Sequence, residues 1–207
     1  MFDSIIFDLD GTLWDAVDNI LISWNEVLKR HTEIDKAITK QALTACMGLK
    51  MDDIAAKLFP KESKERQLAL MAECSEYELE YLAKNGARLF EGTIQTISDL
   101  AKTHRLFICS NCQRGYIECF LKYYELDRYF TDTECWGNTS LSKGENNALL
   151  IERNRLRSPV YVGDTQGDLN SARFAGIPFV FAAYGFGSAD KPDYTINSIT
   201  DLKDIIN

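Results

Sequence analysis

Hydrophobic residues follow two different patterns along the first part of the chain. Residues 4–9 form a short, nearly continuous apolar run, which predicts a buried β-strand. From residue 16 to residue 28, apolar side chains recur every three or four positions, as in a helix with one buried face. Similar texture continues over residues 38–46, 52–59 and 64–84, and Gly86 favours the end of the last helix. We therefore predict an all-helical region over residues 15–85.

Strands and helices alternate in the remainder of the chain. Continuous apolar segments predict strands at residues 105–110, 159–163 and 178–184, with a shorter one at 129–134. Helical patterns separate them, at residues 93–102, 114–124, 144–155 and 168–175. This alternation is typical of a parallel sheet covered on both faces. We predict an α/β fold, a doubly wound (Rossmann-like) parallel sheet built from residues 1–14 and 86–207, with an all-helical insert at residues 15–85.

Composition narrows the class of protein. The chain has 207 residues, of which 45% are hydrophobic, and its net charge of −8 argues against a nucleic-acid partner. No apolar run is long enough to span a membrane, and the N-terminus lacks a signal-peptide pattern, so we expect no membrane partner and a cytoplasmic location. The six cysteines then indicate reduced thiols. The acidic run at residues 73–80 is expected to be a solvated helix face.

Polar residues gather where the predicted strands end. They are two acids after the first strand, a hydroxyl and an amide after the next, and two more acids near residue 163: Asp8, Asp10, Ser110, Asn111, Asp164 and Asp168. Ligands of open parallel sheets bind beyond these carboxyl ends. Several carboxylates at one edge require a compensating cation, and hard oxygen ligands suit Mg²⁺. The sequence therefore predicts a magnesium site at this edge.

One lysine is expected beside these acids. Ser142 and Glu145 have the spacing of a capping box, which places Lys143 in the first turn of a helix. A lysine there opposes the helix dipole, and taken alone it reads equally well as a tolerated surface residue. Beside the acidic strand ends, we predict that it neutralises carboxylates or phosphate. A carboxylate held by Mg²⁺ and a lysine stays ionised and can act as a nucleophile.

Four segments together resemble a known family. The run from Asp8 to Leu13 (DLDGTL) is similar to the first motif of the haloacid dehalogenase-like phosphohydrolases. Ser110-Asn111 resembles their second motif, Lys143 their third, and the run 163–168 (GDTQGD) their fourth. The helical insert resembles the cap of the phosphoglycolate phosphatase-like subgroup, and residues 46–50 fall where that cap carries its substrate-specificity loop.

The resemblance implies a Mg²⁺-dependent hydrolase, a phosphatase that acts on a small phosphorylated metabolite through a phosphoaspartate. A phosphoglycolate phosphatase-like activity is the first hypothesis. Asp8 would attack the phosphorus, while Asp10 would protonate the leaving oxygen and then activate water. Mg²⁺ would be held by the carboxylates of Asp8 and Asp164 and by the backbone carbonyl of Asp10.

The same resemblance assigns the other residues. Ser110 and the backbone of Asn111 would hold the phosphoryl oxygens, and Thr12 is a further candidate for substrate binding. Lys143 would stabilise the charge on the nucleophile and the phosphoryl group. Asp168 would act behind them, by orienting the lysine or a metal-bound water.

Other functions remain open on the sequence. A phosphomutase or a pyrophosphatase could share all four motifs. A signalling receiver also uses acids, Mg²⁺, a hydroxyl and a lysine around a phosphoaspartate, but the helical insert and Asp10 argue against it. Cys109 and Cys112 form a single CxxC, which could serve redox chemistry although a buried structural role is favoured. The physiological substrate and the oligomeric state are not predicted.

Overall fold

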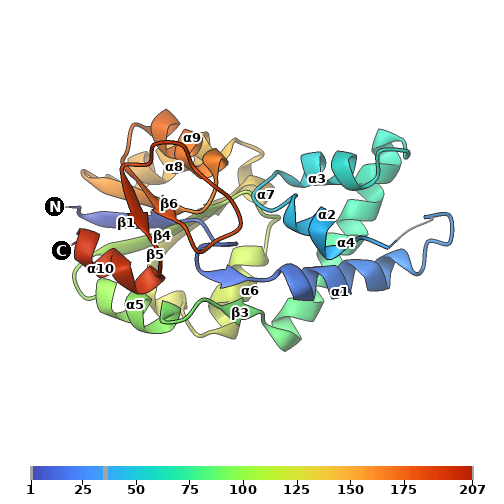
Figure 1. Ribbon diagram of the computed structural model, residues 1–207, viewed down its shortest axis with the longest axis horizontal. Coiled ribbons are helices and arrows are strands. Elements are labelled where there is room, and N and C mark those ends of the chain that lie inside the picture. The colour runs from blue at the N-terminus through green and yellow to red at the C-terminus, as the bar shows by residue number, and fades with distance from the viewer. Residues whose placement is uncertain (1, 35–36, 207) are drawn as a thin grey trace.

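A six-stranded parallel sheet forms the centre of the larger half of the molecule (Figure 1). The computed structural model describes residues 2–34 and 37–206. The strand order is β5-β4-β1-β6-β7-β8, which confirms the predicted doubly wound sheet. The strands are β1 (Ser4–Phe7), β4 (Arg105–Ser110), β5 (Phe130–Cys135), β6 (Pro159–Gly163), β7 (Phe179–Ala182) and β8 (Tyr194–Ile196). Sequence patterns missed β8, because three residues are too few to show a period.

The central strand β1 explains why its sequence is continuously apolar. It pairs in parallel with β4 on one side and with β6 on the other, and all four of its residues are buried. Ile5 and Phe7 face one hydrophobic core, whereas Ile6 faces a second core across the sheet. The chain runs outward from β1 in one direction through β4 and β5, then crosses to β6. The carboxyl ends of β1, β4 and β6 therefore border the crevice where ligands bind in such sheets.

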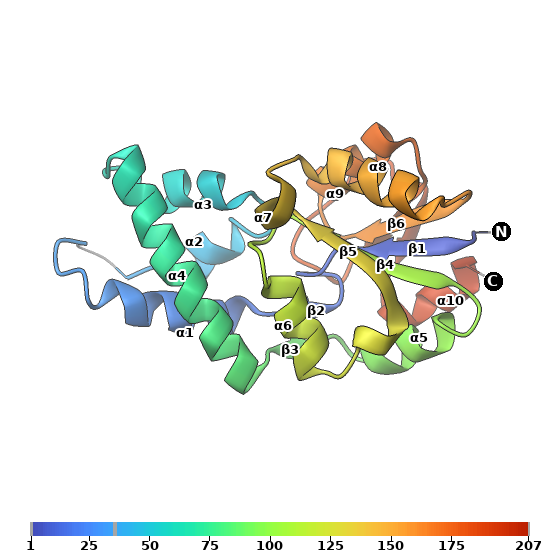
Figure 2. The same cartoon turned by 180° about the vertical axis from the view of Figure 1, so that it is seen from behind.

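Helices cover both faces of the sheet (Figures 1 and 2). The helices α8 (Lys143–Asn154) and α9 (Gln166–Ala175) pack on the face of Ile6. The opposite face is covered by α5 (Thr93–Leu100), α6 (Tyr116–Tyr123) and α10 (Leu202–Ile206). Short elements complete this part: the turns η1 (Asp127–Tyr129) and η2 (Ile199–Asp201), and the helix α7 (Trp136–Thr139).

The segment between the first two core strands is helical, as the sequence indicates. It contains α1 (Val17–Leu28), α2 (Lys40–Thr44), α3 (Met51–Leu58) and α4 (Lys64–Asn85). In Figure 1 these four helices lie together beyond the carboxyl end of β1, away from both chain termini. We call them the cap helices. The helix predicted at residues 38–46 is shorter than expected, because Thr39 caps it by accepting from the N–H of Ala42.

A two-stranded ribbon joins the cap helices to the sheet. β2 (Trp14–Asp15) pairs antiparallel with β3 (Arg88–Leu89), so the chain leaves and re-enters the sheet region side by side. Trp14 is fully buried, and its ring lies 5.1 Å from that of Phe120 and 5.4 Å from that of Tyr116. The domain boundaries at 14/15 and 85/86 stay a prediction. Within the described ranges, no helix is long and apolar enough to cross a membrane.

Candidate active site

The loop after β1 carries two carboxylates one residue apart. Asp8 is 1% exposed, and its N–H donates to the carbonyl of Val162 at 2.8 Å, so it extends the sheet by one residue. Gly11 then turns the chain with a φ of 81°, a conformation that favours glycine. A Cβ atom at Gly11 would lie 2.1 Å from Oδ2 of Asp164. This glycine lets the ends of β1 and β6 approach closely enough for their acids to share a site.

Lys143 lies between two of the acids. Ser142 and Glu145 form the predicted capping box at the start of α8, which holds Lys143 at the first helical position. Its Nζ atom lies 2.7 Å from Oδ1 of Asp168 and 3.0 Å from Oδ1 of Asp8, and the residue is 5% exposed. Burial lowers the pKa of Lys143, but the two carboxylates outweigh it and raise the pKa above its ordinary value. The lysine is therefore a buried, permanent cation at neutral pH.

Asp168 uses both of its carboxylate oxygens within the protein. Oδ2 accepts hydrogen bonds from the backbone N–H groups of Asp164 and Thr165 and from the hydroxyl of Thr165, in a second capping box at the start of α9. Oδ1 accepts from Lys143. A carboxylate engaged in this way fixes the lysine and the β6 loop, and it has little capacity left for a metal ion.

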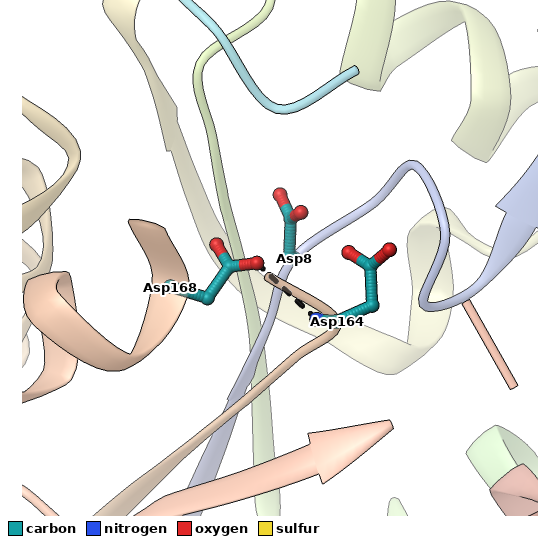
Figure 3. Close-up of side chains that lie close together, drawn as sticks. All are labelled: Asp8, Asp164 and Asp168. Atoms are coloured by element: carbon teal, nitrogen blue, oxygen red, sulfur yellow. Dashed lines mark hydrogen bonds between the residues drawn. The ribbon is translucent and has the colours of Figure 1, made fainter. Parts of the chain in front are cut away.

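Asp8, Asp164 and Asp168 nevertheless form one buried cluster, with ligand oxygens within 4.8 Å of one another (Figure 3). Figure 3 shows the carboxyl groups of Asp8 and Asp164 pointing the same way, out of the sheet. Oδ2 of Asp164 accepts from the N–H of Phe186, but Oδ1 is buried without a hydrogen-bond partner in the described structure. Burial, with the charges of Asp168 and Asp8, raises the pKa of Asp164 to about 8. A bound divalent cation would compensate this orphaned oxygen, so the donor set fits Mg²⁺.

Asp8 and Asp10 differ in their electrostatic surroundings. Burial raises the pKa of Asp8 to about 6, against the opposing effect of Lys143. Burial, together with the charges of Asp8 and Glu78, raises the pKa of Asp10 to about 8. Oδ1 of Asp10 accepts a hydrogen bond of 2.9 Å from the hydroxyl of Tyr116. At neutral pH the first acid is mainly ionised and the second mainly protonated, as an acid/base pair with separate tasks requires.

The remaining predicted residues divide into two groups. Ser110 and Asn111, at the end of β4, line the same cavity as Asp8 and Asp10. The side-chain amide of Asn111 donates to the carbonyl of Gly48 at 2.9 Å, so it contacts the loop between α2 and α3. Thr12 lies elsewhere: it is fully buried, and it is absent from the residues that line this cavity.

Cap helices close the other side of the cavity, and they contribute residues that sequence reasoning missed. Glu78 of α4 is 2% exposed, so the prediction that residues 73–80 form a solvated face is wrong at this position. Its neighbours one turn away, Cys74 and Leu82, are also buried. The spacing 74, 78, 82 is the signal that could have identified it, because residues four apart share a helix face. Gln113, in the loop after β4, and Tyr116, at the start of α6, also line the cavity.

The two cysteines of the CxxC lie in different cores. Cys109 packs with Ile6 and Phe107 below α8 and α9, whereas Cys112 belongs to the core on the opposite face of the sheet. All six cysteines are free thiols. Burial raises the pKa of both Cys109 and Cys112 well above the ordinary value, which lowers the reactivity of each thiol. This placement favours the structural interpretation over a redox pair.

Comparison with known proteins assigns the family. The family model described as haloacid dehalogenase-like hydrolase matches residues 5–182. The chain belongs to this family of hydrolases, and the resemblance inferred from its four motifs is confirmed.

Relatives extend over nearly the whole chain. A phosphoglycolate phosphatase of Vibrio parahaemolyticus is 21% identical, over 98% of this chain and 95% of its own length. A Caldanaerobacter subterraneus protein, provisionally named pyrophosphatase PpaX, is 28% identical over 98% of this chain and 94% of its own length. The solved structure of the haloacid dehalogenase-like protein SP0104 from Streptococcus pneumoniae has the same fold, with a TM-score of 0.86 and 20% identity over 100% of this chain and 99% of that one.

Proposed function

We propose that the protein is a Mg²⁺-dependent phosphatase that hydrolyses the phosphate ester of a small metabolite through a phosphoaspartate. One observation carries the proposal. Asp8 and Asp10 line a single cavity, in which Nζ of Lys143 lies 3.0 Å from Oδ1 of Asp8 and the hydroxyl of Tyr116 donates to Oδ1 of Asp10. A nucleophile and a proton donor are thus held with one residue between them in the sequence.

The chemistry proceeds in two displacements. A carboxylate oxygen of Asp8 attacks the phosphorus, and the bond between phosphorus and the ester oxygen breaks as Asp10 gives its proton to that oxygen. Water then attacks the phosphorus of the phosphoaspartate and loses a proton to Asp10. The bond between the phosphoryl group and Asp8 breaks, so inorganic phosphate leaves and both acids return to their initial states. The raised pKa of Asp10, about 8, suits both directions of proton transfer.

The other site residues neutralise and position charge. Mg²⁺ would be held by the carboxylates of Asp8 and Asp164 and by the backbone carbonyl of Asp10, and when bound it supplies charge neutralisation for the phosphoryl oxygens. Lys143 stabilises the same negative charge from the opposite side. Asp168 is a positioning residue, because its hydrogen bonds hold Lys143 in place.

Ser110 and the backbone N–H of Asn111 are assigned to the phosphoryl oxygens. Ser110 is the last residue of β4 and Asn111 follows it directly, on the same edge as Asp8. Thr12 stays a proposed substrate-binding residue: it is fully buried, and its hydroxyl oxygen has no hydrogen-bond partner among the described residues.

The proposal also treats residues 15–85, which contain the cap helices, as a second domain that moves as a unit. The cavity between them and the sheet has a volume of about 40 Å³, room for only a few water molecules. A metabolite therefore requires the cap to move away before it can bind, and the contact between Asn111 and Gly48 would break. A cytoplasmic location belongs to the same proposal, supported by six unpaired cysteines.

Two alternatives use the same core. A pyrophosphatase or a phosphomutase would share the nucleophile and Asp10. Because one relative is named as a pyrophosphatase, pyrophosphate is included among the compounds to be tested. The receiver hypothesis is less compatible with Asp10, whose carboxyl group would promote hydrolysis of the phosphoaspartate.

The test is phosphate release from a panel of phosphorylated metabolites, including phosphoglycolate and pyrophosphate, with and without Mg²⁺. We expect Mg²⁺-dependent release by the wild type and a loss of at least about 10³-fold in Asp8→Asn, because the amide is a poor nucleophile. Asp204→Asn, an exposed acid on α10, is the matched control and should retain full activity. Full activity in Asp8→Asn, or no release from any compound by the wild type, would contradict the proposal.

A further inference from the structure

Glu78 is a buried carboxylate at the cap end of the catalytic cavity. It comes from α4, it is 2% exposed, and it lines the same cavity as Asp8 and Asp10. Its Oε2 atom accepts a hydrogen bond of 2.5 Å from Nε1 of Trp24 on α1. The proposed chemistry does not use this side chain. A buried carboxylate in a cavity is costly to ionise unless a ligand compensates its charge.

Positive charge near the cavity comes from Lys143, which contacts Asp8 at the opposite end. Among the residues that the structure describes, no lysine, arginine or histidine lines the cavity. Lys143 is already engaged by Asp8 and Asp168. Lys50, in the loop between α2 and α3, lies near Glu145, where its charge adds to the hydrogen bonds from Ser142 in lowering the pKa of that acid. A second anionic group on a substrate would therefore meet Glu78 and no cation.

The rest of the cap surface is apolar. Six apolar side chains of the cap segment line the cavity beside Trp24, namely Ile20, Leu43, Met47, Leu49, Met51 and Ile54. Such a surface accommodates hydrocarbon, and Glu78 is the only charged group that the cap helices add within the described residues. The combination fits a compact organic group that ends in a hydrogen-bond donor.

We infer that Glu78 selects phosphate monoesters whose leaving alcohol carries no negative charge and presents a hydrogen-bond donor, with amino alcohols as the best fit. The inference rests on the proposed phosphatase function. An ammonium group would pair with the carboxylate in a low-dielectric site, and a hydroxyl would donate to it. A carboxylate or a second phosphate would be repelled and left without a partner. Phosphoglycolate and sugar bisphosphates are then poor substrates.

A purely structural Glu78 would only hold Trp24 in place. That role requires a hydrogen-bond acceptor, which a glutamine also supplies through its side-chain carbonyl. Selectivity for the charge of the leaving group requires the carboxylate itself. The two roles therefore separate in Glu78→Gln, in which the acceptor remains and the charge is lost.

Three substrates of nearly equal size test the inference: 2-aminoethyl phosphate, 2-hydroxyethyl phosphate and phosphoglycolate, whose leaving groups carry positive, zero and negative charge. For each we would measure, with saturating Mg²⁺, kcat/KM and the inhibition constant against p-nitrophenyl phosphate. The pH is 8, where Glu78 is mainly ionised although burial raises its pKa to about 7. We expect both measures to favour the amine over the hydroxyl and the hydroxyl over the acid, with at least about tenfold between the extremes. In Glu78→Gln the ratio should fall towards one, mainly through a lower KM for phosphoglycolate. Glu80→Gln, an exposed acid on the same helix, should keep the wild-type ratio.

The outcomes separate this inference from the function on which it rests. Equal values for the three compounds, or a preference for phosphoglycolate, would overturn the charge selectivity and leave the phosphatase intact. An unchanged ratio in Glu78→Gln would overturn the assignment to Glu78, and Lys50→Ala would then identify the competing group. Absence of Mg²⁺-dependent release from every compound, p-nitrophenyl phosphate included, would overturn the proposed function and the inference with it.

Discussion

The two ends of the catalytic cavity are built on different principles. At the sheet end, two acids share one buried cation: Lys143 bridges Asp8 and Asp168, and the hydroxyl of Thr165 donates to Asp168. At the cap end, apolar side chains surround one carboxylate, Glu78, whose hydrogen bond comes from a neutral indole. A fixed network of acids around one lysine, completed by a divalent cation, suits a constant phosphoryl group. A surface with a single unbalanced charge suits discrimination among leaving groups.

Loss of the buried cation should give the largest effect at the sheet end. Lys143→Ala removes the partner of Asp8 and leaves two carboxylates to repel each other. We expect kcat to fall by about 10³-fold, since electrostatic stabilisation of the phosphoryl group is lost. Proton uptake by the acids would limit the damage to the fold, so turnover should suffer more than stability. Kinetics with saturating Mg²⁺ and thermal unfolding measure the two effects.

A surface lysine supplies the control for this experiment. Lys203→Ala removes an ion pair to Asp99 at the partly exposed end of the chain. We expect less than about 1 kcal/mol of lost stability and unchanged turnover. Equal effects of Lys143→Ala and Lys203→Ala on kcat would refute the proposal that Lys143 stabilises the phosphoryl group.

The sheet end was largely predictable from sequence, for a physical reason. Asp8, Asp164 and Lys143 lie directly after strands or at a helix start, and the parallel sheet brings those positions to one edge whatever the loops do. The strands themselves were predictable because both faces are buried. Thr12 stays a prediction, because proximity to a motif in sequence does not show whether a side chain faces the cavity.

The cap end was not predictable in the same way. Glu78 lies within an acidic run, and only the helix period shared with Cys74 and Leu82 distinguishes it from its solvated neighbours. Its position over Asp10 depends on how α4 packs against α1 and α6, which is a tertiary fact. Tyr116 likewise reaches Asp10 from the first turn of α6, across 106 residues of sequence. Long-range packing of this kind leaves no local pattern.

A second substitution tests how closely the sheet-end loops must approach each other. Gly11→Ala places a Cβ atom 2.1 Å from Oδ2 of Asp164 at a φ of 81°. We expect the loops to separate and activity to fall by about 10²-fold. The Mg²⁺ concentration that gives half-maximal activity should rise, because misplaced ligands lose affinity for the metal. The measurement is a Mg²⁺ titration of phosphate release.

Gly176 provides a matched control for backbone strain. It has a similar φ of 71°, and a Cβ atom there would have no neighbour within 4 Å. Gly176→Ala should therefore lower stability by about 1 kcal/mol without changing the Mg²⁺ titration. The same loss of activity in both variants would show that strain, and not the approach to Asp164, limits the site.

The cap end should reveal its unbalanced charge in the dependence of stability on pH. Burial raises the pKa of Glu78 from its ordinary 4.5 to about 7, against the hydrogen bonds of its neighbours. Between these values the folded chain holds a proton that the unfolded chain releases, so this group stabilises the fold less as pH rises. Glu78→Gln removes the dependence, and its stability relative to wild type should increase between pH 5 and pH 8 by on the order of 2 kcal/mol. Urea unfolding at each pH measures the difference, with Glu80→Gln as a flat control. If the difference in unfolding free energy between Glu78→Gln and wild type is constant with pH, the pKa of Glu78 is not raised in the folded protein.

The smallest expected effect lies where the two ends meet, at Tyr116. Its hydroxyl donates to Asp10 and stabilises the charged form of that acid, so Tyr116→Phe should raise the pKa of Asp10 further. The first displacement requires Asp10 to be protonated, and the alkaline limb of kcat/KM should therefore move to higher pH, by about one unit at most. Tyr184→Phe, which loses a hydrogen bond to the carbonyl of Thr12 instead, should leave that limb in place. A shift to lower pH in Tyr116→Phe would mean that the limb reports another group and that Asp10 is not the proton donor.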